Sequence, residues 1–174
     1  MTTSVRSSSL IERLVRALIL DRTLYEEVAG DRAGLSQAIG VVILAGLANG
    51  TRFVPALGNV GLLLGIFVSL VSWLMLGLFI HATGAGIARP PRPSYRKLVA
   101  CLGFADMPAV VTLFGALPVV GDFVRIIVWF WLLAACLVAT RAAFKASLAR
   151  GALIGGLGFG AYFLLGVVVS ILMP

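Results

Sequence analysis

Charge is scarce in this sequence. Only 12% of its 174 residues are charged, whereas 60% are hydrophobic, and the mean hydropathy is +1.07. A soluble domain of this length carries about twice that share of charge. The composition therefore excludes an ordinary water-soluble domain and predicts an integral membrane protein.

Residue types that perform most enzymatic chemistry are few as well. The chain has one histidine, His81, and two cysteines, Cys101 and Cys136, none of them at metal-ligand spacing. No nucleophile and base stand in a recognisable catalytic pattern. We therefore expect no enzymatic activity, no metal and no cofactor, and we expect both cysteines to be small buried apolar side chains.

The N-terminal segment, residues 1–32, does not read as a secretory signal, because Glu12, Arg13 and Arg16 interrupt its apolar residues. Ser9 and Glu12 have the spacing of a helix capping box. One face of the expected helix over residues 8–20 is apolar and comprises Leu10, Ile11, Leu14, Val15 and Leu18. That face either lies in the lipid headgroup region or packs on the protein's own helices.

Five apolar stretches follow, each close to the roughly 20 residues that a helix needs to cross about 30 Å of hydrocarbon. Backbone groups in lipid must be paired internally, so these stretches are expected to be helices. The predicted fold is all-α: a polytopic transmembrane bundle over residues 33–174, preceded by an amphipathic interfacial helix. The expected spans are 33–50, 60–82, 98–117, 123–140 and 152–173.

The basic residues indicate the orientation. With the N-terminus in the cytoplasm, twelve of the 14 Lys and Arg residues fall on the cytoplasmic side, and only Arg52 and Arg125 fall opposite. This is a strong positive-inside bias, and it places the C-terminus on the far side. The net charge of +7 is thus explained by topology, and we expect no nucleic-acid partner.

Asp106 and Pro108 interrupt the third expected span. Asp106 lies about 12 Å along that helix from its cytoplasmic end, where an acid is a candidate for carrying a proton or binding a cation. It could also be neutral, or pair with a hydroxyl or with Arg141. Arg125 enters from the opposite side and is expected to meet Asp122 instead.

Pro108 removes one helical hydrogen bond and is expected to kink the third span. The freed carbonyl needs a donor, which a neighbouring helix or a protonated Asp106 could supply. We interpret the two residues as one structural feature: Pro108 bends the helix, and Asp106 helps to satisfy the polar groups at the bend. A working proton or cation site is the alternative.

Two further patterns suggest contacts. Glycines at four-residue spacing let helices approach closely, and the last span carries the densest set: Gly151, Gly155, Gly156 and Gly160. The linker before the third span is basic, and its cations could bind anionic lipid headgroups or simply signal topology. Those cations are Arg89, Arg92, Arg96 and Lys97.

The order of these features resembles the Yip1 domain family of five-span membrane proteins, in its short bacterial form. The resemblance rests on "DRTLYEEVAGDRAGLSQAIGVV", on "GFADMPAVVTLFGALPVVGDFVRIIVWFWLLAACLVATRAAF" and on the glycine-rich last helix. It implies a bacterial inner membrane, a cytosolic N-terminus and a C-terminus on the opposite side. Eukaryotic relatives act in vesicle traffic with Rab-type GTPases. This chain lacks their long hydrophilic N-terminal region and DLYGP-like motif, so that role is not transferred.

These observations predict a non-enzymatic membrane protein that organises or scaffolds the membrane, or that serves as an accessory subunit of a larger membrane complex. Its expected partners are the lipid bilayer and either other membrane proteins or a second copy of the chain. No small-molecule substrate is identified. The alternative function is a small transporter or channel that uses Asp106.

Overall fold

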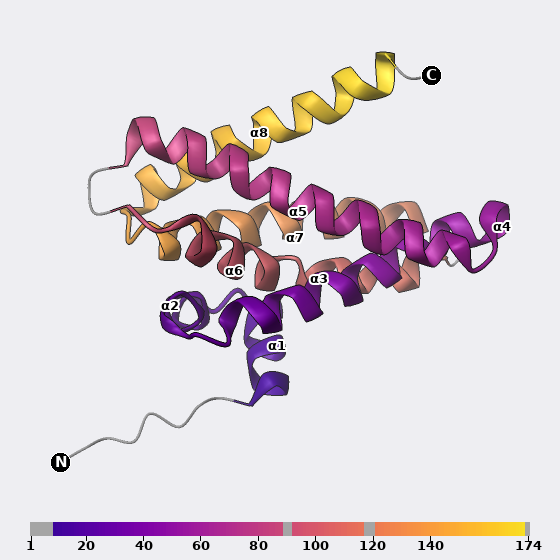
Figure 1. The fold of residues 1–174 in the computed structure, drawn as a ribbon, viewed down its shortest axis with the longest axis horizontal. Coiled ribbons are helices and arrows are strands. Elements are labelled where there is room, and N and C mark those ends of the chain that lie inside the picture. The colour runs from indigo at the N-terminus through magenta and orange to yellow at the C-terminus, as the bar shows by residue number, and fades with distance from the viewer. Residues whose placement is uncertain (1–8, 89–91, 117–120, 173–174) are drawn as a thin grey trace.

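The computed structural model describes residues 9–88, 92–116 and 121–172, which are helical and contain no strand (Figure 1). The all-α prediction is confirmed for this part of the chain. The elements are α1 Leu10–Leu18, α2 Arg22–Gly30, α3 Gly34–Gly50, η1 Thr51–Phe53, α4 Val54–Leu57, α5 Val60–Ile87, α6 Tyr95–Ala105, η2 Met107–Ala116, α7 Gly121–Ala143 and α8 Leu148–Leu172.

Four helical segments among the described residues are long and apolar enough to cross a membrane. They are Gly34–Leu57, Val60–Ile87, Phe123–Ala143 and Leu148–Val168. They match the first, second, fourth and fifth expected spans. By length and composition these four helices indicate a membrane protein, whereas the count of five spans is not confirmed.

The third expected span is not one continuous α-helix. The α-helix α6 ends at Ala105, and after Asp106 the chain continues as the 3₁₀-helix η2. Pro108 has no amide hydrogen, and its ring would clash with the carbonyl four residues earlier, so the α-helical pattern cannot pass through it. The expected kink is therefore a change of helix type. The two pieces, of 11 and 10 residues, together rise about 36 Å at the usual 1.5 and 2.0 Å per residue.

Glycines bring α3 and α5 into backbone contact. A Cβ placed on Gly65 would meet backbone atoms of Gly46 and Gly50, and one placed on Gly61 would meet Phe53. Gly46 with Gly50, and Gly61 with Gly65, have the four-residue spacing that permits close helix approach. Glycines thus let α3 and α5 pack with their backbones in contact.

The segment formed by α6 and η2 advances in the same direction as α3. Gly103 lies against Ala38 in the first half of α3. Further along, the Thr112 hydroxyl donates to Asn49 Oδ1 near the end of α3, at 3.3 Å. Because both contacts progress toward the C-terminal end of α3, α6 and η2 together traverse most of the length of that helix.

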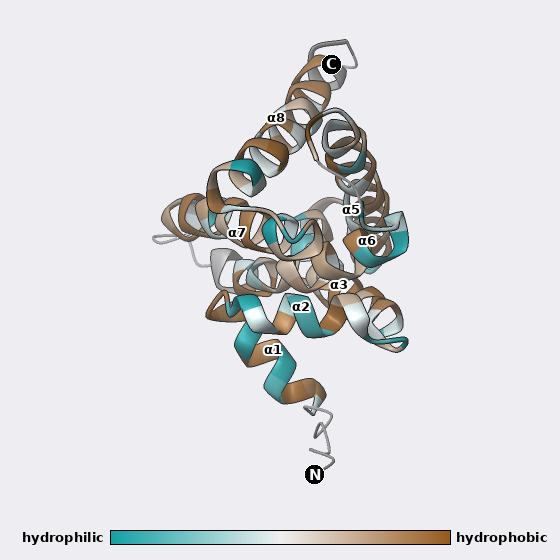
Figure 2. Cartoon of the chain, turned by 90° about the vertical axis from the view of Figure 1, so that its left-hand side faces the viewer, coloured by the Kyte–Doolittle hydropathy of each residue, from teal (hydrophilic) through white to brown (hydrophobic). Residues whose placement is uncertain are grey.

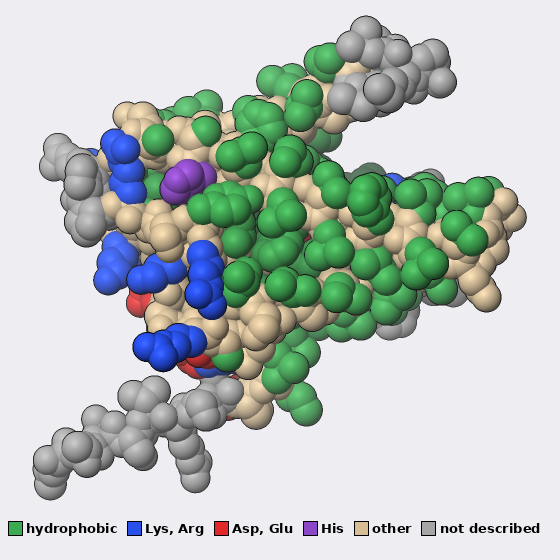
Figure 3. Space-filling model, in the orientation of Figure 1, with side chains coloured by type: hydrophobic (Ala, Val, Ile, Leu, Met, Phe, Trp, Pro, Cys, Tyr) green, Lys and Arg blue, Asp and Glu red, His purple; other side chains and the backbone are tan. Residues whose placement is uncertain are grey.

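Large apolar side chains cover the outside of the long helices. Leu63 and Phe67 on α5, and Phe130 on α7, are each at least 60% exposed. Brown, hydrophobic residues run along α5, α7 and α8, whereas α1 and α2 carry both teal and brown residues (Figure 2). Lys and Arg side chains gather at the left-hand end of the face drawn in Figure 3, and hydrophobic side chains cover its centre. Such a surface is suited to a lipid environment.

Candidate functional site

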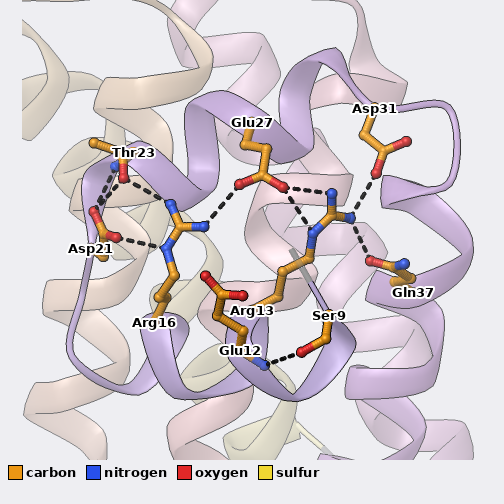
Figure 4. A network of polar contacts seen from close by, with 9 residues as sticks. All are labelled: Ser9, Glu12, Arg13, Arg16, Asp21, Thr23, Glu27, Asp31 and Gln37. Carbon is orange, nitrogen blue, oxygen red and sulfur yellow. Dashed lines mark hydrogen bonds and ion pairs between the residues drawn. The ribbon is translucent and has the colours of Figure 1, made fainter. Parts of the chain in front are cut away.

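The first candidate site joins the N-terminal helix α1 to α2 and α3 through the buried guanidinium of Arg13 (Figure 4). Its Nη2 and Nε donate to Glu27 Oε1 at 2.6 and 3.1 Å. Its Nη1 donates to Asp31 Oδ2 and to Gln37 Oε1, both at 2.6 Å. Charge-assisted hydrogen bonds of this kind are stronger than neutral ones, so Arg13 clamps α1 onto two later parts of the chain.

Arg16, one turn further along α1, extends the same network. Its Nε donates to Asp21 Oδ2 and its Nη1 to Glu27 Oε2, each at 2.8 Å. Its Nη2 donates to the Thr23 hydroxyl at 2.8 Å. Glu27 therefore bridges both arginines. Asp21 also caps α2, because it accepts a hydrogen bond from the Thr23 backbone N–H at 2.9 Å.

Both aspartates of the network are held in the ionised form. Hydrogen bonding from Arg16, with a contribution from Thr23, lowers the pKa of the Asp21 carboxyl below its usual value. The backbone N–H of Ala33 and the Arg13 guanidinium lower the pKa of Asp31. At neutral pH both aspartates of the clamp are thus charged.

Arg13 and Arg16 dock α1 on the following elements, and several apolar side chains of α1 stay exposed. Ile11 is 75% exposed and Ile19 is 70% exposed, and Leu10 and Val15 are about half exposed. Only Leu14 and Leu18 of the apolar face pack partly against the core. The Trp131 indole on α7 donates to the Leu18 carbonyl at 3.0 Å and fixes the end of the helix.

The second candidate site is a cavity of about 450 Å³ that contains Asp106 in its lining. The lining comes from α3, η1, α5, α6, α7 and α8. Its other polar residues are Asn49, Arg52, Ser69, Ser72 and Tyr162, and its aromatic residues are Phe53, Trp73, Trp129, Phe159, Tyr162 and Phe163. Asp106, which has no polar neighbours in the sequence pattern of its span, thus lines a cavity together with polar and aromatic side chains from other elements.

The crossing of α5 and α8 creates the space. The two helices touch where Gly158 lies against Ile80 and where the Thr83 hydroxyl donates to the Ile154 carbonyl at 3.3 Å. Beyond that point α8 leaves the bundle at an angle (Figure 1). The lining residues Trp129 and Phe163 remain 39% and 49% exposed, so the cavity opens to the exterior.

Aromatic contacts fix the walls of the cavity. The Trp73 indole donates to the Val99 carbonyl at 2.9 Å, which ties α5 to α6. Trp129 makes edge-to-face contacts with Phe159 and Phe163, at ring-centre distances of 5.9 and 6.1 Å. This geometry is favourable for aromatic pairs, and it joins α7 to α8 across the opening.

Asp106 itself is half-buried at the end of α6. No described side chain gives its carboxylate a hydrogen bond or an ion pair. Arg141 lies against Gly151 and is not part of the cavity lining. Arg125 lines a neighbouring cavity of about 400 Å³ that also includes Asn49 and Arg52. The predicted contact of Arg125 with the Asp122 side chain lies outside the part that the structure describes.

The glycines singled out on the last helix fall into two groups. Gly151 lies against Arg141, and Gly155 lies against Leu137 and Thr140, so this pair faces α7. A Cβ on Gly156 or Gly160 would meet nothing within 4 Å. The second pair therefore faces away from the bundle.

The remaining sequence candidates are placed as follows. Arg92, Arg96 and Lys97 are exposed, and Arg96 Nη2 donates to the Arg32 carbonyl at 3.2 Å. Arg89 lies outside the described residues. The His81 ring packs edge-on against Tyr95 at 5.8 Å.

Both cysteines are buried and free, and Cys101 Sγ donates to the Tyr25 carbonyl at 3.3 Å. Among the described residues no three His, Cys, Asp or Glu side chains gather as metal ligands would.

Comparisons with known proteins identify no relative: no family model, no curated protein and no solved structure matches this chain. The resemblance to the Yip1 domain family therefore stays a prediction. The function has to be argued from the two sites themselves.

Sequence reasoning missed the partners at both sites. Glu27, Asp31 and Gln37 showed no pattern linking them to Arg13, since they lie 14 to 24 positions later. A usable signal existed on α5, where Ser69, Ser72 and Trp73 stand at the spacing of one helix face.

Proposed function

We propose that this chain is a non-enzymatic inner-membrane protein that organises the bilayer through its N-terminal helix, or that serves as an accessory subunit in a membrane complex. The observation that carries the proposal is the orientation of α1. Its charged side is clamped by Glu27 and Asp31, and its apolar side presents Ile11, Val15 and Ile19 outward. A helix with this division of sides is suited to lie in the headgroup region of a leaflet.

The proposed topology has five crossings, with the N-terminus in the cytoplasm and the C-terminus opposite. The rise of about 36 Å over α6 and η2 supports the third crossing, because the hydrocarbon layer is about 30 Å thick. The contacts of Gly103 with Ala38 and of Thr112 with Asn49 support it as well. The gathering of Lys and Arg side chains toward one end of the molecule supports the orientation (Figure 3).

The position of α1 can be tested with a fluorescent probe on an introduced cysteine, because Cys101 and Cys136 are buried. The protein would be labelled at Ile11→Cys and reconstituted with brominated lipids. Quenching of the probe is expected at position 11. A probe at Glu26→Cys, on the exposed side of α2, is the matched control and should stay unquenched. Equal, weak quenching at both positions would contradict the proposed contact with lipid.

To organise the membrane, α1 must change the shape of the bilayer as well as contact its lipids. Inserting α1 into one leaflet expands that leaflet, so reconstituted wild-type protein should shift liposomes to smaller diameters in electron cryomicroscopy. The double variant Ile11→Glu and Val15→Glu changes only exposed positions and should lose the shift while the bundle remains folded. Identical diameter distributions for both proteins would refute the organising role.

The accessory-subunit version uses the outward side of α8. Gly156 and Gly160 leave space there for a second helix to approach closely. Native electrophoresis in mild detergent should place the wild-type chain in a larger complex. The double variant Gly156→Leu and Gly160→Leu should run at its own size. A wild-type chain that migrates alone would contradict this version.

A second function is favoured by the cavity at Asp106. Asn49, Ser69 and Ser72 line the same cavity as the acid and supply the additional polar groups that a transport path needs. A cation or proton flux into liposomes that is present in wild type and lost in Asp106→Asn would support a transporter or channel. Absence of flux in the wild-type protein would count against it.

A further inference from the structure

We propose that the cavity at Asp106 is a binding site for a hydrophobic organic cation, such as a quaternary ammonium or phosphonium compound. The inference deepens the second function above by naming the class of ligand. It concerns binding alone, so it does not require that the ligand is carried across the membrane.

The acid provides the charge selectivity. Asp106 lies within a bundle of apolar helices, and no described side chain neutralises its carboxylate by an ion pair or a hydrogen bond. A charge in such surroundings gains strongly from a counter-charge, since Coulomb interactions are weakly screened there. A cation that enters the cavity would supply the missing partner.

The aromatic walls favour an organic cation. Trp73, Trp129 and Phe159 line the same cavity as Asp106 and come from three different helices. The negatively charged ring faces of aromatic side chains attract cations, most strongly for tryptophan. Their apolar area would at the same time bury the hydrocarbon part of the ligand.

The polar lining disfavours a bare metal ion. Hard cations favour sites with several carboxylate ligands, whereas Asp106 is the one acid among the described residues of the lining, and the other side-chain oxygens come from Asn49 on α3, Ser69 and Ser72 on α5, and Tyr162 on α8. The cavity volume of about 450 Å³ is also within the range of sites for small organic molecules. Both properties suit a ligand that carries its own apolar shell.

Arg52 also lines the cavity and adds a positive charge that opposes the binding of a cation. Its guanidinium stacks on the Phe53 ring at 4.5 Å from the ring centre, and the residue is exposed. It follows α3, whereas Asp106 follows α6. A cation in the cavity would be attracted by Asp106 and repelled by Arg52, so removal of the two charges should change its affinity in opposite directions.

Binding can be measured with tetraphenylphosphonium and the full chain in lipid nanodiscs, because Trp73 and Trp129 report on the cavity through their fluorescence. Saturable quenching is expected above the background of empty nanodiscs. Asp106→Asn should weaken binding by about tenfold or more, as expected for loss of a poorly screened charge pair. Arg52→Gln should strengthen binding, and Glu26→Gln, which removes an exposed acid outside the cavity, should leave it unchanged.

Tetraphenylborate, an anion of nearly the same shape, tests the charge selectivity without any substitution. It should bind the wild-type protein much more weakly than tetraphenylphosphonium. Equal binding of the two ions, or unchanged phosphonium binding in Asp106→Asn, would overturn the proposal. If Asp106→Asn does not fold, the comparison of the two ions and the Arg52→Gln variant still decide the matter. Saturable phosphonium binding without flux would refute transport while leaving the site in place.

Discussion

Replacing Arg13 with alanine should release α1 from the rest of the protein. The Arg13 side chain is 4% exposed and makes ion pairs with Glu27 and Asp31, both at 2.6 Å. Removing one partner of a buried pair costs about 3–5 kcal/mol. The two acids are 25% and 29% exposed, so water recovers part of that energy. We expect the free energy of undocking α1 to fall by about 2–3 kcal/mol.

Hydrogen exchange measured by mass spectrometry in nanodiscs would detect this change locally. A loss of about 2–3 kcal/mol corresponds to an increase of about 30- to 150-fold in the exchange rate of protected amides in α1. The long helices α5 and α7 should keep wild-type rates, because the hydrogen bonds of Arg13 to Glu27, Asp31 and Gln37 hold α1 to α2 and α3.

The control is Arg22→Ala, which removes an exposed ion pair with Glu26 whose side chains are 41% and 46% exposed. Such surface pairs contribute about 0–0.5 kcal/mol, so α1 should exchange nearly as in wild type. The double variant Arg13→Ala with Glu27→Ala should cost less than the sum of the single changes, because the two groups interact directly. If Arg13→Ala exchanged within threefold of wild type, the clamp would not hold α1.

Two further changes test the packing and the electrostatics. Gly65→Ala places a Cβ against the backbone of α3 and should lower the free energy of unfolding in detergent by about 1–3 kcal/mol. A Cβ at Gly156 meets nothing within 4 Å, so Gly156→Ala should be neutral or slightly stabilising. Equal shifts of the melting temperature in the two variants would count against the α3–α5 contact. The pKa values of Asp21 and Asp31 lie below the ordinary 3.8 in the folded protein. The two carboxylates therefore contribute fully to the docking of α1 above pH 3.8, and this contribution is lost as the pH falls through their lowered pKa values. A spin label at Val15→Cys should therefore keep one mobility from pH 8 to about pH 5 and become more mobile below about pH 4; a loss of order already at pH 6 would contradict the assignment.

The sequence predicted the long helices well because hydrophobic runs of sufficient length have few alternatives in lipid. It placed their ends less well. The expected span 60–82 is part of a helix that continues to Ile87, and the span 123–140 continues to Ala143. Composition marks the part of a helix that is as apolar as the hydrocarbon layer, and the helices extend beyond it.

The third expected span shows where local reasoning stops. Pro108 predicts an interruption of the α-helix, but both a kinked α-helix and a change to a 3₁₀-helix are compatible with a proline at that position. The choice depends on how η2 packs against α3 and α7, including the Thr112 contact with Asn49. That contact joins residues 63 positions apart, which single-sequence patterns do not reveal.

The two sites were predictable to different degrees. Spacing alone predicted an apolar and a charged side for α1, but it could not tell that Arg13 would dock, because the acids that bind Arg13 lie in later elements. At the cavity, the sequence singled out Asp106 but not Asn49 or Ser72, because these polar residues are on separate elements until α3, α5 and the end of α6 bring them together.

The most direct test of the proposed membrane arrangement is the side on which Ser147 and the C-terminus lie. Ser147 is exposed between α7 and α8, so a cysteine there can be labelled with a membrane-impermeant reagent. If residues 95–116 cross the bilayer, Ser147→Cys reacts only from the cytoplasmic side and a reporter at the C-terminus is active only on the opposite side. If Ser147→Cys reacts from outside and the C-terminal reporter is cytoplasmic, that segment does not cross and the five-span arrangement is wrong.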